Sequence, residues 1–131
     1  SSPLMKATRP AIFTVSHRLA ERAAETWIAQ TTRLPMPRWL KKPSRIPWTK
    51  GDWALCRRAF DAGARWMLKP FQQVCGFDRS PSGAQFQKAW REVRADITRQ
   101  DATLRESLAL SWHSGRVFLE LWIQEQRFGR L

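Results

Sequence analysis

The sequence is poor in the residues that build catalytic and metal sites. It has no tyrosine, two cysteines, two histidines and six glycines in 131 residues. Cys56 and Cys75 are too few for a disulfide framework and lack metal-ligand spacing. We find no glycine-rich phosphate loop, no His-Glu-x-x-His pattern and no nucleophile elbow, and His17 and His113 lie far apart in the sequence. The sequence therefore predicts a non-enzyme without a metal, in which Cys56 is a buried thiol on an apolar helix face.

Acidic residues are also scarce, and the imbalance is uneven along the chain. Lys and Arg number 23 against 11 Asp and Glu, which gives a formal net charge of +12. Residues 1–50 hold ten basic and two acidic side chains, whereas residues 101–131 hold four of each. A large positive excess indicates phosphate partners, which are RNA, DNA or anionic lipid. The basic part comes first and the more neutral part last.

Apolar residues recur at helical spacing in four segments, and no stretch alternates as a strand does. The first segment is 15–33, followed by 49–69 with a Thr49-x-x-Asp52 cap, where Pro70 should break or kink the helix. Ser82-x-x-Gln85 is a capping box that opens the third. The residues expected on the buried faces are Leu19, Ala23, Trp27 and Ile28, then Trp53, Cys56, Phe60, Ala64 and Met67, then Phe86, Trp90, Val93 and Ile97. The predicted fold class is all-α.

Between the first two helices, residues 34–48 form a proline-rich basic arm. Its Trp39 and Trp48 flank Lys41, Lys42 and Arg45. Aromatic and basic side chains together suit stacking on bases, and they equally suit a membrane interface with its headgroups. The alternative is that both tryptophans simply anchor the arm on the folded domain.

The last 29 residues carry the most information. Thr103-x-x-Glu106 is a capping box, and residues 107–124 then contain only two formal charges, Arg116 and Glu120. Eighteen residues span roughly 27 Å as a helix, close to the hydrocarbon thickness of a bilayer. The small residues Ser107, Ser111 and Gly115 recur every four positions, a pattern typical of close helix packing. These features predict one continuous helix that crosses a membrane, or else an amphipathic helix of a soluble bundle.

If the helix crosses a membrane, its two charges need compensation. Arg116 and Glu120 are one helical turn apart and can neutralise each other. Charged side chains within a bilayer usually face a protein partner, so we expect a second contact surface on this side of the helix. Gly115→Leu should then loosen a partner helix without unfolding the rest of the chain.

The C-terminal half resembles subunit g of the mitochondrial F-type ATP synthase, over roughly residues 57 to 129. The resemblance rests on Thr103 to Leu108 at the start of the last helix and on Trp122, Ile123 and Glu125 near its end. Upstream, Gly76-Phe77, Ser80-Pro81 and Ala84-Gln85-Phe86 are similar to the family pattern G-[LF]-x-P-P-x-x-A-[QE]-F. Two features depart from the family. The small pair Ser111 and Gly115 replaces G-x-x-x-G, and residues 124–130 differ from its closing G-E-I-I-G-R-R.

The resemblance implies a non-catalytic Fo subunit that packs on subunit e and supports ATP synthase dimers and cristae shape. The chain would divide into a basic extension at 1–50, matrix-side amphipathic helices at 51–101, a membrane helix at 102–127 and a tail at 128–131. It would lie in the mitochondrial inner membrane with its N-terminal part on the matrix side. The expected lipid-facing residues are Lys41, Lys42, Arg45, Arg57 and Arg58 for headgroups such as cardiolipin, and Trp39, Trp48 and Trp122 at the membrane interface.

Nucleic acid is not a partner in that interpretation, but it is in the alternative. A soluble, basic, all-α protein such as an organellar ribosomal subunit would bind phosphate through the same basic residues and stack bases on Trp39 or Trp48. A soluble adaptor that docks proteins on its helix faces is a third class. Of these three classes the resemblance favours the first, the Fo subunit, with the nucleic-acid-binding protein as the alternative.

Overall fold

The chain is all-α in its computed structural model. The structure describes residues 17–32, 48–76, 78–100 and 102–128, and these form four helices and no strand. The helices are α2 (His17–Thr32), α4 (Lys50–Cys75), α5 (Gly83–Arg99) and α6 (Leu104–Phe128). Residues 107–124 lie in one continuous helix, as predicted. Most of the arm at 34–48 lies outside the described residues.

Three helices begin where the sequence predicts a cap. Thr49 and Asp52 form a reciprocal capping box at α4, and Ser82 and Gln85 form one at α5. At α6, the Glu106 backbone N–H donates to the Thr103 hydroxyl, and the Thr103 N–H donates to the Glu106 carboxylate, both at 3.1 Å. Each box satisfies backbone donors that a helix start leaves without partners.

The second helix was predicted to end at residue 69, with Pro70 breaking or kinking it, and this predicted end is wrong. Pro70 lies exposed inside α4, which continues to Cys75 and closes at Gly76 in the left-handed conformation with φ of 61°. The extra turn buries Phe71 against the last turns of α6. Burial of an aromatic side chain can offset the backbone hydrogen bond that proline removes.

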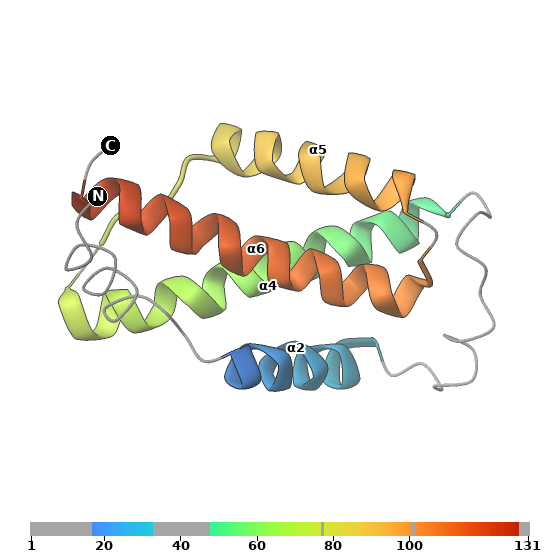
Figure 1. Ribbon diagram of the computed structural model, residues 1–131, viewed down its shortest axis with the longest axis horizontal. Coiled ribbons are helices and arrows are strands. Elements are labelled where there is room, and N and C mark those ends of the chain that lie inside the picture. The colour runs from blue at the N-terminus through green and yellow to red at the C-terminus, as the bar shows by residue number, and fades with distance from the viewer. Residues whose placement is uncertain (1–16, 33–47, 77, 101, 129–131) are drawn as a thin grey trace, which may run out of the picture.

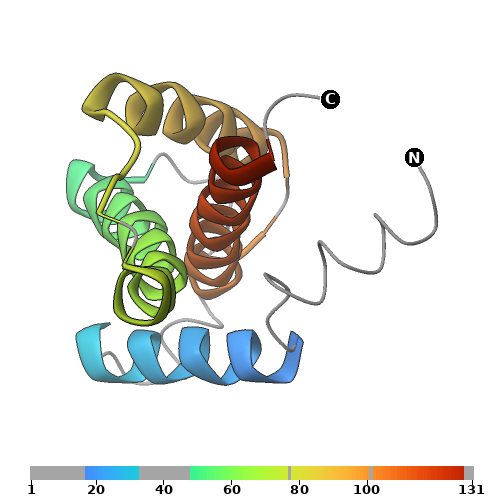
Figure 2. The same cartoon turned by 90° about the vertical axis from the view of Figure 1, so that its left-hand side faces the viewer.

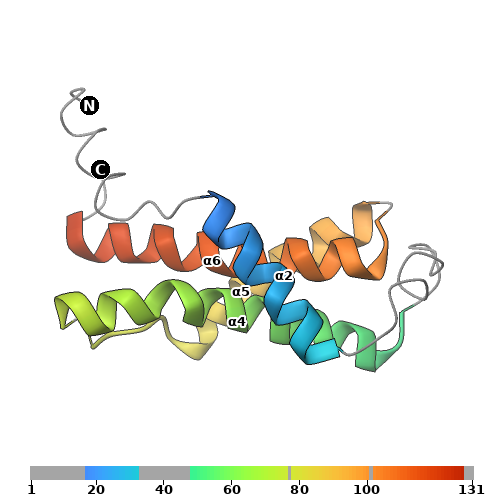
Figure 3. The same ribbon diagram turned by 90° about the horizontal axis from the view of Figure 1, so that it is seen from below.

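The helices stack in three layers. In Figure 1, α4 and α6 run side by side in the same direction, and α5 returns antiparallel to both. Figure 2 shows α5 on one side of this pair and α2 on the other. Figure 3 shows α2 crossing both long helices obliquely. The central pair therefore supplies one face to each outer helix, and most tertiary contacts lie between α4 and α6.

The core has two parts along the α4–α6 pair. The first draws on all four helices and is centred on Phe60 and Trp112. The second lies between the C-terminal halves of α4 and α6, where Met67 and Leu68 meet Leu119 and Ile123. In α2 the buried face is Ala20, Ala24 and Ile28. Leu19, predicted to be buried there, is 52% exposed because the small alanines form the contact with the central pair.

The described helices include none that is both long enough and apolar enough to cross a membrane. This corrects the expectation of a transmembrane helix at 102–127. Length is not the limit, since α6 has 25 residues. Its central turns carry His113, Ser114, Arg116 and Glu120, and such polar groups lower the mean hydropathy below that of a span.

Candidate functional site

The small-residue face of α6 packs on α4 of the same chain. A Cβ atom on Gly115 would lie 1.9 Å from the Phe60 carbonyl oxygen, and one on Gly63 would lie 1.9 Å from the Trp112 carbonyl oxygen. Each glycine thus faces the backbone of the other helix, where only hydrogen fits. The expected partner of Ser107, Ser111 and Gly115 was a helix of another subunit, whereas the structure places this face against α4.

Gly63 was not recognised from the sequence, although a signal was present. Ala59 and Gly63 are four residues apart, the same small-xxx-small spacing as Ser111 and Gly115. Both Ala59 and Gly63 are buried. Two matching patterns on two helices would have predicted that α4 and α6 pack on each other.

Polar groups are buried next to this crossing. The Ser111 hydroxyl donates to the Ser107 carbonyl oxygen at 2.7 Å, which satisfies it within α6. The Ser107 hydroxyl is buried without a hydrogen-bond partner in the described part of the chain. Cys56 is fully buried, as predicted, and burial raises its pKa from 9.0 to about 12, against an opposing hydrogen bond with Ser111. The thiol is therefore neutral and unreactive at physiological pH.

Arg116 and Glu120 form the predicted pair. The Arg116 Nη1 atom lies 3.0 Å from a carboxylate oxygen of Glu120, and the two side chains are 14% and 16% exposed. Arg116 Nε is buried with no partner among the described residues. A partly buried pair of this kind depends on each partner, because the loss of one leaves the other charge uncompensated.

On its other side, α6 borders a groove shared with α5. Two adjoining hollows of about 460 and 310 Å³ share Ala89, Glu92, Phe118 and Leu121, so we treat them as one α5–α6 groove. The described residues include three exposed large hydrophobic side chains, and two of them, Val117 (39%) and Leu121 (59%), line it. Phe60 and Phe118 both line it, with 5.8 Å between their ring centroids, and Phe86 packs 5.3 Å from Phe118. The groove leaves a second apolar stripe of α6 open to solvent.

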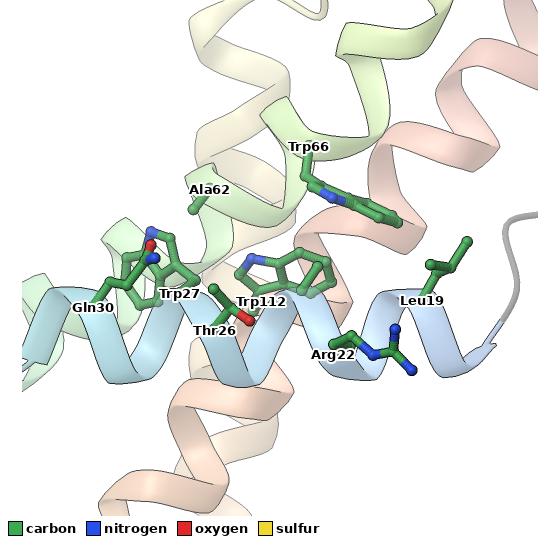
Figure 4. Close-up of a pocket in the computed structure, with 9 residues that line it drawn as sticks. Leu19, Arg22, Thr26, Trp27, Gln30, Ala62, Trp66 and Trp112 are labelled. Atoms are coloured by element: carbon green, nitrogen blue, oxygen red, sulfur yellow. The ribbon is translucent and has the colours of Figure 1, made fainter.

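A further hollow of about 440 Å³ lies between α2 and the central pair. Trp27, Trp66 and Trp112 line it, and Arg22 is its one charged lining residue in the described part of the chain. Figure 4 shows the indoles of Trp66 and Trp112 above α2, with the side chains of Leu19 and Arg22 extending from that helix. The Trp66 and Trp112 rings are 5.2 Å apart and tilted, so this wall is part of the core rather than a polar binding site.

Basic and aromatic side chains meet at the N-terminal end of α4. Trp48 packs on Trp53 with 4.9 Å between ring centroids, and the Arg94 guanidinium lies 4.5 Å above Trp53. The Trp48 indole nitrogen is buried, which supports an anchoring role for this residue. Arg57 is bound to Asp61 at 3.1 Å and to Gln87 at 2.8 Å, so it is already engaged within the chain.

The other predicted contact residues are dispersed. Trp39, Lys41, Lys42 and Arg45 lie outside the described residues. Arg58 is exposed on α4. Trp122 was expected at a membrane interface, but it is 8% exposed and belongs to the second part of the core. Glu125, the acid of the family motif, lines the α5–α6 groove.

The two histidines, far apart in sequence, meet where α2 crosses α6. The rings of His17 and His113 stack with centroids 6.4 Å apart, and His17 lies 2.7 Å from Glu21. Burial lowers the pKa of His113, with Arg116 and His17 acting in the same direction and Glu21 and Glu25 opposing them. An ion pair between Arg105 and Glu25 joins the same two helices. The histidine contact and the Arg105–Glu25 ion pair thus both link α2 to α6. The described residues bring no group of three or more potential metal ligands together.

Comparison of the sequence with models of known protein families, with curated proteins and with solved structures found no match.

Proposed function

We propose that the protein is a non-catalytic structural subunit that docks helices of partner proteins in a larger assembly. One observation carries this proposal. The small-residue face of α6 is covered by α4, but Val117 and Leu121 form a second stripe of α6 that is exposed to solvent beside α5. Exposed apolar stripes at helical spacing are typical docking sites for a further helix.

The resemblance makes the Fo sector of mitochondrial ATP synthase the first assembly to test. Some of the residues that carry it, Gln85 and the pair Thr103 and Glu106, belong to the capping boxes that begin α5 and α6. In this proposal the chain contacts subunit e and neighbouring Fo subunits. Its basic segments lie on the matrix side against anionic headgroups such as cardiolipin, and α6 serves as a packing helix.

Co-purification tests the proposal. The full chain, tagged and extracted in mild detergent, should bring Fo subunits with it. The double variant Val117→Ala/Leu121→Ala should reduce their recovery several-fold, while Leu19→Ala, which changes the exposed leucine on α2, should not. Recovery of the chain without Fo subunits would exclude this assembly. Protease cleavage of residues 1–50 only from the intermembrane-space side would exclude the matrix-side orientation.

A second function, nucleic-acid binding, is favoured by the charge distribution. Segments 1–16 and 33–47 contain seven Lys or Arg residues and no Asp or Glu. The second segment continues directly into Trp48, which packs on Trp53. The Arg94 guanidinium lies above the Trp53 ring. Basic segments on a helical body suit phosphate backbones.

Salt dependence distinguishes this function from the first. RNA binding by the full chain should weaken steeply with salt, and Lys41→Gln/Lys42→Gln/Arg45→Gln should lower the slope by about 2, since each phosphate contact contributes about 0.7 to 0.9. The matched control is Arg18→Gln/Arg22→Gln/Lys69→Gln, three exposed basic residues on α2 and α4. Equal loss in both triple variants would indicate nonspecific attraction to net charge.

A further inference from the structure

The α5–α6 groove combines an apolar floor with an acidic rim. The floor includes Val117 and Leu121, the two exposed large apolar side chains among the described residues of α6. Among the described residues, the ionisable side chains that line the groove, apart from His113, are Glu92, Asp96, Glu125 and Lys88. Three carboxylates against one ammonium give the described lining an excess of acidic groups, although Asp96 is paired with Arg99 and the whole chain has a net charge of +12.

The dimensions of the groove suit a helix. Leu110, Ser114, Val117 and Leu121 line it at spacings of four, three and four residues, so they form one stripe along α6. Eleven residues of helix rise about 16 Å, or three turns. On the facing side, Ala89 and Val93 of α5 lie one turn apart and provide a short apolar wall. A third helix lying between them would meet three apolar side chains and Ser114 over about three turns of α6, and carboxylates at its edges.

We infer that the α5–α6 groove binds a basic amphipathic helix of a partner protein. The apolar stripe of that helix would cover Val117 and Leu121, and its flanking Lys or Arg side chains would reach Glu92 and Asp96. Asp96 already pairs with Arg99 along α5, so Glu92 is the main contact for an incoming cation. This partner chemistry deepens the proposed function and rests on it, because it specifies what the exposed stripe of α6 docks.

A synthetic peptide tests the partner chemistry directly. The probe is an 18-residue amphipathic helix with a leucine stripe and lysine flanks, labelled for fluorescence anisotropy and titrated with the full chain. A peptide with the same stripe and glutamate flanks is the charge control. The lysine peptide should bind at least tenfold more tightly than the glutamate peptide, since opposite charges across a rim favour the correct partner.

Matched variants locate the binding surface. Val117→Ala/Leu121→Ala should weaken lysine-peptide binding about tenfold or more, because several buried methylene equivalents are lost. Glu92→Gln should weaken it about threefold, within the range of one exposed ion pair. The controls are Leu19→Ala and Glu21→Gln on α2, which should leave binding unchanged. Every side chain changed in this set is exposed on a helix, so circular dichroism should report the same fold for all variants.

Several results would overturn the proposal. Equal binding of both peptides would show that the rim charge selects nothing, and equal loss in the α2 controls would show that the groove is not the site. A concentration-dependent dimer that Leu121→Ala dissociates would make a second copy of the chain the occupant. Loss of peptide binding with intact co-purification of Fo subunits would overturn the partner chemistry alone, whereas the reverse result would overturn the assembly alone.

Discussion

The two long contacts of α6 differ in how closely the helices approach. Toward α4, two glycines face backbone carbonyl groups, and a single added methyl group would clash at 1.9 Å. Toward α5, large side chains stand between the helices. Phe118 of α6 meets Phe86 of α5 edge to face, and Phe60 of α4 fills the space beneath them.

Side-chain size at the contact accounts for the difference. Interaxial distances depend on the residues at the crossing, and glycine permits the closest approach. Aromatic residues keep α5 at a distance, so part of α6 remains uncovered and a groove results. The same helix is therefore fixed on one side and open on the other. Substitutions at these two contacts, and at the ionisable groups buried beside them, test this comparison.

Gly115→Ala should have the largest effect. The new Cβ would overlap the Phe60 carbonyl oxygen, and backbone atoms cannot move aside as a flexible side chain can. We expect a loss of about 3 kcal/mol or more in the free energy of unfolding, beyond typical overpacking, even after the gain in helix propensity. Urea unfolding measures it. From the sequence, Gly115→Leu was expected to loosen a partner helix without unfolding the chain. Because Gly115 packs against α4 of the same chain, this variant should destabilise the fold itself.

Gly83→Ala is the matched control, because a Cβ there meets nothing within 4 Å. Its stability should remain within about 0.5 kcal/mol of the parent, as for other surface changes. Gly63→Ala should be nearly as damaging as Gly115→Ala. The double variant should cost less than the sum of the two, since the first clash already separates the helices. Additive losses would contradict a shared crossing point.

Phe118→Ala should cost less, about 2 kcal/mol, because the ring is only half-buried. The loss reflects the contacts with Phe60 and Phe86, at 5.8 and 5.3 Å between centroids. The groove should deepen at the same time, which a hydrophobic dye reports as increased fluorescence. Leu121→Ala, at a residue 59% exposed, is the control for stability. Equal losses for these two variants would contradict the spacer role of Phe118.

Removal of one charge of the Arg116–Glu120 pair should cost about 1–2 kcal/mol. Both side chains are mostly buried, so Arg116→Leu or Glu120→Leu leaves the other charge uncompensated. The double variant should be more stable than the sum of the single losses predicts. Thermal unfolding of the three variants gives the coupling. Simple additivity would indicate that the two charges are solvated independently.

Local features of the sequence were sufficient for much of the fold. Thr49, Ser82 and Thr103 begin helices as their side chains predict, because a capping box involves only neighbours in sequence. The Cys56 and Phe60 face of α4 is also buried as predicted. Pro70 was misleading because its effect depends on the next turn of the helix, where Phe71 is buried against α6.

The candidate site depended on contacts between distant segments, and these were harder to predict. Ser111 and Gly115 correctly indicated close packing, but the choice between α4 and a foreign helix depended on recognising Gly63. The pairing of His17 with His113 results only from the crossing of α2 over α6. The indole of Trp122 suits a buried core and a membrane interface equally, so the sequence alone could not distinguish these two locations.

The smallest expected effect comes from Cys56, a buried titratable residue of α4 at the contact between α4 and α6. Burial raises its pKa from 9.0 to about 12, and nearby Asp52 acts in the same direction. In the unfolded chain the thiol ionises above pH 9, while in the folded chain it stays protonated. The contribution to stability is therefore fully present below pH 9 and is lost as pH rises toward 12. Between pH 8 and pH 10 the free energy of unfolding should fall by about 1 kcal/mol from this group.

Cys56→Ala should remove that part of the decline. An unchanged slope in the alanine variant would mean that the thiol can ionise in place, and hence that the α4–α6 contact opens more readily than its glycine packing implies.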